Sequence, residues 1–138
     1  MQDFEIGGET MITQIYGVPI FVRDQEQAIG FYRDVLGFTV SRDVQMGTFR
    51  WVTVCPKDKP DTQFILGLAP ENDENFANTS GIVLYCEDIQ AAYDHFVSQG
   101  VQFEQPPVLM PFGEYLARFA DPDGNQFQLV ECRPASNT

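Results

Sequence analysis

The chain has 138 residues, 43% of them hydrophobic and 20% charged, values that fit one domain with a buried core and exclude a disordered tail protein. Its formal net charge of −12 argues against nucleic acid and anionic membrane surfaces as partners, and no run approaches the ~20 apolar residues of a membrane span. The acids are scattered along the chain, so they indicate a well-solvated surface that is also compatible with a cationic small molecule.

The N-terminal residues MQDFEIGGET are acidic and lack an apolar run, so we expect no signal peptide. The cysteines Cys55, Cys86 and Cys132 are odd in number and share no CxxC spacing, and each lies in or beside an expected strand. We therefore expect three buried, reduced thiols in a cytoplasmic protein. A catalytic thiolate is the alternative, although no nearby histidine supports it.

The first expected strand covers residues 18–24 (VPIFVRD) and ends at Asp24, a residue type that caps a following helix. Gly37 ends that helix. The apolar side chains at helical spacing between them are Ala28, Phe31, Tyr32, Val35 and Leu36. Strand-like segments follow at about 38–45, 48–55 and 62–68.

The same order recurs in the second half of the chain. Residues 82–88 (IVLYCED) match residues 18–24, Asp88 takes the place of Asp24, and Gly100 ends the second helix. Strand-like segments follow at about 101–109, 112–120 and 125–132. We predict a single α+β domain over 1–138, built from two tandem βαβββ modules. Module one covers about 13–68, the linker 69–79 and module two about 80–132.

The acidic run FADPDGNQFQLVE at 119–131 leads into the last expected strand. It does not match a calcium-binding EF-hand loop, because the twelfth residue counted from Asp121 is Cys132 where that loop requires Glu. Pro122 and Gly124 favour a tight turn, and the alternation that follows is typical of a half-buried strand. We predict a turn and a strand here.

Three segments carry a family resemblance: VRDQEQAIGFYRDVLGF at 22–38, EDIQAAYDHFVSQGV at 87–101 and DPDGNQF at 121–127. With the repeated βαβββ order, they resemble the vicinal oxygen chelate superfamily, which includes glyoxalase I, extradiol dioxygenases, fosfomycin-resistance enzymes and bleomycin-resistance proteins. The resemblance covers nearly the whole chain beyond residue 12. It implies curved mixed sheets around a cavity.

Metal-dependent members of that superfamily take ligands from the first strand of each module, usually His, and from the last, usually Glu. The resemblance places these positions at Gly17, Gly81, Ile65 and Gln128, of which only Gln128 has a donor. Glu131 shares the parity of residues expected to face the helix. We therefore predict no metal, no cofactor and no catalytic residue.

Strand alternation also assigns side chains to the sheet faces that the helices leave uncovered. An aromatic wall with a few amides and one guanidinium suits a flat or apolar ligand. The alternatives are ordinary core packing for the aromatics and a surface ion pair for Arg118. His95, the only histidine, lies beside the apolar stripe of the second helix and is expected at the surface. The predicted ligand-binding residues are Phe21, Phe49, Trp51, Gln63, Tyr85, Glu114, Arg118 and Gln128.

The sequence thus predicts a metal-free protein of the bleomycin-resistance type that sequesters a small aromatic or cationic molecule without catalysis. Its expected partners are that small molecule and a second copy of the chain in a homodimer, with neither nucleic acid nor membrane. One alternative is a metal-dependent lyase or isomerase that resembles glyoxalase I or an epimerase. A second alternative is a non-catalytic module that binds another protein.

Overall fold

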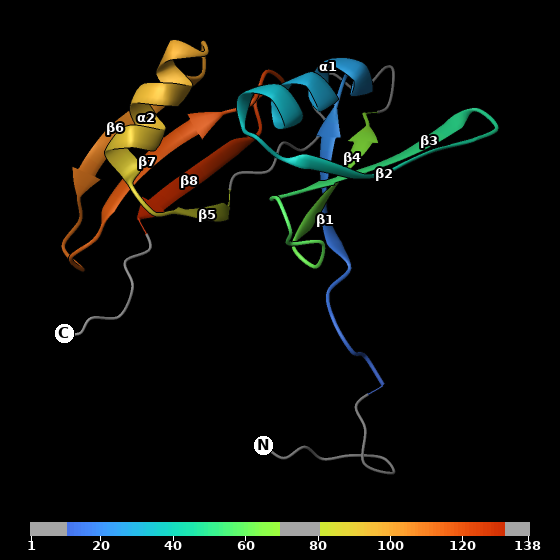
Figure 1. Cartoon of the computed structure of the whole chain (residues 1–138), viewed down its shortest axis with the longest axis horizontal. Helices are drawn as coiled ribbons and strands as arrows, with labels where there is room; N and C mark the ends of the chain where they lie inside the picture. Colours follow the sequence, from blue (N-terminus) through green and yellow to red (C-terminus); the bar gives the residue numbers. More distant parts are fainter. Residues whose placement is uncertain (1–10, 70–80, 132–138) are drawn as a thin grey trace.

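The computed structural model describes residues 11–69 and 81–131, and it confirms two tandem βαβββ modules (Figure 1). Most of the predicted linker lies outside the described residues, as does Cys132; Cys55 is a buried thiol and Cys86 is half-buried. Module one contains β1 (Gly17–Val22), α1 (Gln25–Gly30), η1 (Phe31–Val35), β2 (Thr39–Met46), β3 (Phe49–Cys55) and β4 (Gln63–Leu68). Module two contains β5 (Ile82–Cys86), α2 (Ile89–Ser98), β6 (Gln102–Leu109), β7 (Tyr115–Ala120) and β8 (Gln126–Glu131).

Each module forms one mixed four-stranded sheet. The strand orders are β1-β4-β3-β2 and β5-β8-β7-β6. The pairs β1–β4 and β5–β8 are parallel and the remaining pairs are antiparallel. Within the described residues, β1 and β5 therefore each have one strand partner and one open edge. No helix among these residues has the length and apolar character needed to cross a membrane.

The expected caps start both helices. The Asp24 carboxylate accepts hydrogen bonds from the backbone N–H groups of Glu26 (2.9 Å) and Gln27 (3.1 Å), and Asp88 accepts from Ala91 (3.0 Å). The first helix differs from the expectation in one respect. It widens after Gly30 into the π-helical turn η1, which carries the fully buried Tyr32.

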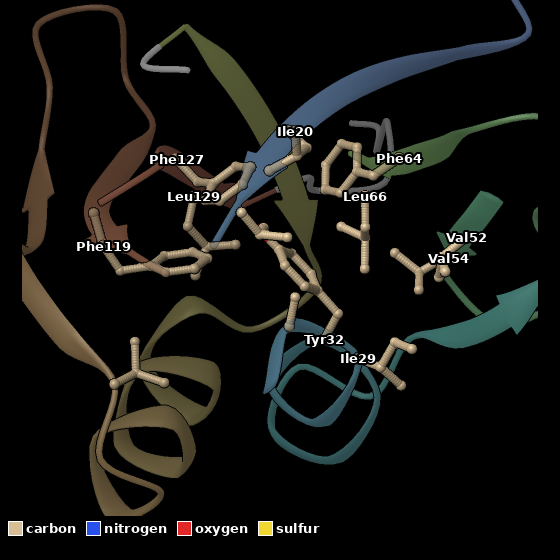
Figure 2. Packing of buried hydrophobic residues seen from close by; sticks show 14 of the residues in the cluster. Ile20, Ile29, Tyr32, Val52, Val54, Phe64, Leu66, Phe119, Phe127 and Leu129 are labelled. Carbon is tan, nitrogen blue, oxygen red and sulfur yellow. The ribbon is translucent and has the colours of Figure 1, made fainter. Parts of the chain in front are cut away.

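The helix-facing sides of both sheets share one hydrophobic core (Figure 2). The ring of Phe64 in β4 stacks on Phe127 in β8 at a centroid distance of 5.6 Å, and Phe127 stacks on Phe119 in β7 at 5.5 Å. Tyr32 meets both Phe64 and Phe127 edge-on. Because the two modules pack through these sides, the opposite face of each sheet lies outside the shared core.

A buried polar cluster, here called the inter-module latch, joins the modules beside this core. It consists of Tyr32, Asp121 and Asn125. The Asp121 side chain, only 5% exposed, accepts hydrogen bonds from the Tyr32 hydroxyl (2.8 Å), the Asn125 backbone N–H (2.8 Å) and the Asn125 Nδ2 (2.9 Å). Asn125 Nδ2 also donates to the backbone oxygen of Phe21 in β1 (3.0 Å). The acidic run is thus a turn, as predicted, and it fastens module two to module one.

The Tyr32 hydroxyl of the latch remains protonated and acts as a hydrogen-bond donor. Burial, followed by the charge of Asp121, raises the pKa of Tyr32 well above its ordinary value. The phenol therefore stays protonated and available as a hydrogen-bond donor to Asp121.

Candidate ligand-binding site

The outer face of the first sheet carries a cluster of aromatic side chains, here called the aromatic patch: Tyr16, Phe21, Phe49 and Trp51. The Trp51 ring lies 6.0 Å from Tyr16 and 6.3 Å from Phe49, and its Nε1 donates to the Tyr16 hydroxyl at 3.3 Å. Phe21 and Phe49 are 38% and 53% exposed, respectively. An exposed aromatic surface of this kind suits stacking against a flat molecule.

Gly67 makes room for part of this patch. Phe21 in β1 is the register partner of Gly67 in β4, and a Cβ atom at Gly67 would lie 3.4 Å from the Phe21 ring. The absence of a side chain thus lets the ring rest across β4. A glycine inside an otherwise apolar strand was the sequence signal for this close approach.

Gln63 supports the patch rather than offering a free amide. It is 8% exposed; its Nε2 donates to the backbone oxygen of Tyr16 (2.9 Å) and its Oε1 accepts from the Ser41 hydroxyl (3.0 Å). Ser41 also shares a 2.6 Å hydrogen bond with Thr53. The sequence placed Gln63 on this face, but it did not identify Ser41 as the partner that holds it.

The outer face of the second sheet is a ladder of side-chain rows, here called the amphipathic ladder. Strand register defines two adjacent rows that run across the four strands. The apolar row contains Tyr85, Val130, Leu116 and Val108. The second row, called the polar row after its three polar members, contains Gln128, Arg118 and Gln105, with Val83 at its β5 end. Tyr85 is 73% exposed, and both Arg118 and Gln128 retain access to solvent.

Most of the acidic side chains considered near the aromatic patch and the amphipathic ladder accept hydrogen bonds from other residues of the chain. Glu104 accepts a hydrogen bond from Gln126 Nε2 at 2.8 Å. Asp43 lies on the helix-facing side of the first sheet, where two hydrogen bonds from Arg50 hold its pKa below the usual range. Glu114, half-buried, lies in the turn before β7. Of these three acids, Glu104 and Asp43 are thus engaged by hydrogen bonds within the chain.

The four superfamily metal-ligand positions do not fit a divalent ion. At Gly17 a Cβ atom would lie 3.0 Å from the Gln63 backbone oxygen, so even a small side chain is crowded there. Ile65 and Gly81 have no donor, and the Gln128 amide alone is a poor anchor. Glu131 accepts a hydrogen bond from the Ile89 backbone N–H at the start of α2 (3.3 Å), on the helix side as predicted.

A cavity of about 760 Å³ opens between the modules along the edges of β1 and β5. Gln63 and Tyr85 line it, whereas the other predicted ligand-binding residues lie outside its lining. Among the described residues, no hydrogen bond, ion pair or ring contact connects the aromatic patch to the amphipathic ladder. One chain therefore presents two candidate half-sites, the aromatic patch and the amphipathic ladder, on sheet faces turned away from the shared core.

His95 has no place in either half-site. It is exposed on α2, and its ring neighbours Phe96 at 5.7 Å. This position agrees with the predicted surface role.

Comparison with known proteins gives a consistent picture. A family model described as the Glyoxalase/Bleomycin resistance protein/Dioxygenase superfamily matches residues 12–129. The uncharacterized protein YetH of Bacillus subtilis (strain 168) is 34% identical over 122 residues, which cover 88% of this chain and 100% of YetH.

Solved structures agree as well. A superfamily member from Sphaerobacter thermophilus DSM 20745 is 42% identical with a TM-score of 0.79, over 89% of this chain and 100% of that chain. TnmS3, an antibiotic binding protein from Streptomyces sp. CB03234, is 28% identical with a TM-score of 0.77, over 89% of this chain and 98% of its own.

Proposed function

Because this chain belongs to the Glyoxalase/Bleomycin resistance protein/Dioxygenase superfamily, we propose that it binds a small aromatic molecule and leaves it chemically unchanged. The observation that carries the proposal is the exposed aromatic patch on a sheet face whose metal-ligand positions are not filled. The similarity to TnmS3, an antibiotic binding protein, supports the same class of function. Binding alone would protect a cell by mass action, since it lowers the free concentration of a toxic compound.

The proposal includes a second copy of the chain. The open edges of β1 and β5 border the same cavity, and their exposed apolar side chains include Val18 and Val83. Open strand edges pair readily with other strands. If the β5 edge of a partner lay beside β1, the two sheets would continue into one another. The aromatic patch of one chain and the amphipathic ladder of the other would then line the same curved surface.

Two further parts of the proposal follow from charge and thiol chemistry. Stacking would supply the affinity for an aromatic ligand; for the alternative, a cationic ligand, the net charge of −12 would speed the encounter. The buried thiol of Cys55 fits a reducing compartment, so we place the protein in the cytoplasm.

Metal analysis separates this proposal from a metal-dependent lyase or isomerase. After incubation of tag-free protein with Zn²⁺, Ni²⁺, Mn²⁺ or Fe²⁺ and desalting, we expect mass spectrometry to find far less than one ion per chain. The reason is that Gly17, Ile65 and Gly81 provide no donor. The variant Gln128→Glu serves as a control and should retain no more metal, because one carboxylate does not complete a site. Near-stoichiometric retention by the wild type would contradict a metal-free site and would call for lyase and dioxygenase assays.

A further inference from the structure

Arg118 differs from three other arginines of the described residues in making no ion pair there, a property that it shares with Arg42 in β2. Arg23 lies 3.5 Å from Asp123, Arg33 lies 2.9 Å from Asp34, and Arg50 lies 2.8 Å from both Glu26 and Asp43. In the described part of the chain Arg118 has no such ion pair. Its Nη2 donates to the Gln105 side-chain oxygen at 3.3 Å, a contact with a neutral group. Most of the guanidinium donors therefore remain available at the exposed sheet face.

The polar row places Arg118 between two amides. Gln128 is its register partner in β8 and Gln105 its register partner in β6, so three polar side chains stand abreast on adjacent strands. A guanidinium presents its N–H donors in a planar fork that matches a carboxylate or sulfonate. The Gln128 amide can add a donor to the same oxygens, whereas Gln105 Nε2 already donates to the Leu116 backbone oxygen (3.2 Å). This row is equipped to bind an acidic oxygen group.

The neighbouring rows give the acidic group an orientation. The apolar row with Tyr85, Leu116 and Val130 lies two residues along the strands, a separation of roughly 7 Å. On the other side Glu104, hydrogen-bonded to Gln126, contributes a negative charge. An aromatic acid could place its rings against Tyr85, the exposed aromatic member of the apolar row, and its acidic group over Arg118, whereas Leu116 and Val130 are buried. The reversed orientation would bring two negative charges together.

Building on the proposed function, we propose that the preferred ligand is an aromatic compound with an acidic oxygen substituent. Arg118 is the residue that selects for that substituent. In the completed cavity the aromatic patch stacks on the rings, and the Arg118 guanidinium with the Gln128 amide binds the oxygens. This assignment narrows the ligand to aromatic acids in spite of the strongly negative net charge of the chain, because short-range pairing acts at the site itself.

Two fluorescent probes with the same ring system test the selection. 8-Anilinonaphthalene-1-sulfonate carries a sulfonate, and N-phenyl-1-naphthylamine lacks it. We expect Arg118→Gln to lower the affinity for the sulfonate probe by about 10-fold or more. The affinity for the neutral probe should fall by less than about 2-fold. Arg33→Gln, which removes the same charge from the surface of η1, should leave both affinities unchanged. Equal losses for both probes, or no loss for the sulfonate probe, would overturn the selection role.

A conservative variant and the aromatic patch separate the possible failures. Arg118→Lys keeps the charge and is expected to recover part of the affinity for the sulfonate probe. If this variant instead loses affinity for both probes equally, the effect of the substitution is structural and the proposal is wrong. If the neutral probe binds through Trp51 while Arg118→Gln leaves the sulfonate probe unchanged, only the acid selectivity is wrong. If the wild type binds neither probe, both the selectivity and the proposed function are wrong.

Discussion

Replacing Trp51 with alanine is expected to weaken the binding of N-phenyl-1-naphthylamine by about 30-fold or more, a loss of about 2 kcal/mol. Trp51 lies at the centre of the aromatic patch, with Tyr16 and Phe49 on either side. The substitution removes the largest stacking surface and also releases the Tyr16 hydroxyl. Fluorescence titration measures the affinity, and light scattering shows whether the oligomeric state is retained.

His95→Ala is the control, since it removes an exposed aromatic ring from α2, which packs on the sheet of module two. It should leave the affinity unchanged. If Trp51→Ala binds the probe as tightly as the wild type, the aromatic patch is not the binding surface. The cavity beside β5, where Leu36 and Phe96 line the wall, would then become the better candidate.

Asp121→Ala is expected to lower the free energy of unfolding by about 3–5 kcal/mol. The carboxylate is buried and accepts from Tyr32, Asn125 and the backbone N–H of Asp123. Its removal leaves two buried donors, the Tyr32 hydroxyl and the Asn125 backbone N–H, without this acceptor and detaches the turn that holds module two against β1. Urea denaturation at neutral pH measures the change.

Two further variants provide a smaller expected loss of stability and a control. Tyr32→Phe removes one donor and keeps the ring in the core, so we expect a smaller loss of about 1–2 kcal/mol. Asp34→Ala removes an exposed acid on η1 and should have no measurable effect. If Asp121→Ala were as stable as Asp34→Ala, the latch would not hold the modules together.

Features set by local patterns could be predicted from the sequence. The strand expected at about 101–109 is observed as Gln102–Leu109, because the alternation and the flanking Gly100 are visible in the chain itself. Alternation also separates the two faces of β3: Val52 and Val54 are fully buried on the helix side, and Phe49 is exposed on the other face, where Thr53 is nevertheless buried as well. A period of two residues is enough for such an assignment.

Features that depend on contacts between distant segments could not be predicted. The turn at 121–125 was recognised, but its bond from Asn125 to the Phe21 backbone oxygen joins residues far apart in the chain. Gln63 has the right parity for a ligand contact, yet Ser41 and Tyr16 occupy its amide. Likewise, alternation predicted which strand side chains face away from the helices, but it did not show that the two modules share one core on the helix side.

The π-helical turn η1 marks a second limit. The spacing of apolar residues after Asp24 predicted one helix to Gly37, and the backbone instead widens at Phe31. Periodicity describes which side chains share a face, but it does not distinguish neighbouring hydrogen-bond patterns.

The central claim is that module one of one chain and module two of its partner together form the ligand cavity. A mixed dimer of Trp51→Ala and Tyr85→Ala chains, purified by two different affinity tags, tests it directly. In the proposed arrangement one cavity combines both substitutions and the other combines two intact modules. We therefore expect each single variant to bind the neutral probe weakly and the mixed dimer to recover one site of wild-type affinity. A mixed dimer without any wild-type-affinity site would contradict the claim, because a cavity within one chain always keeps one of the two substitutions.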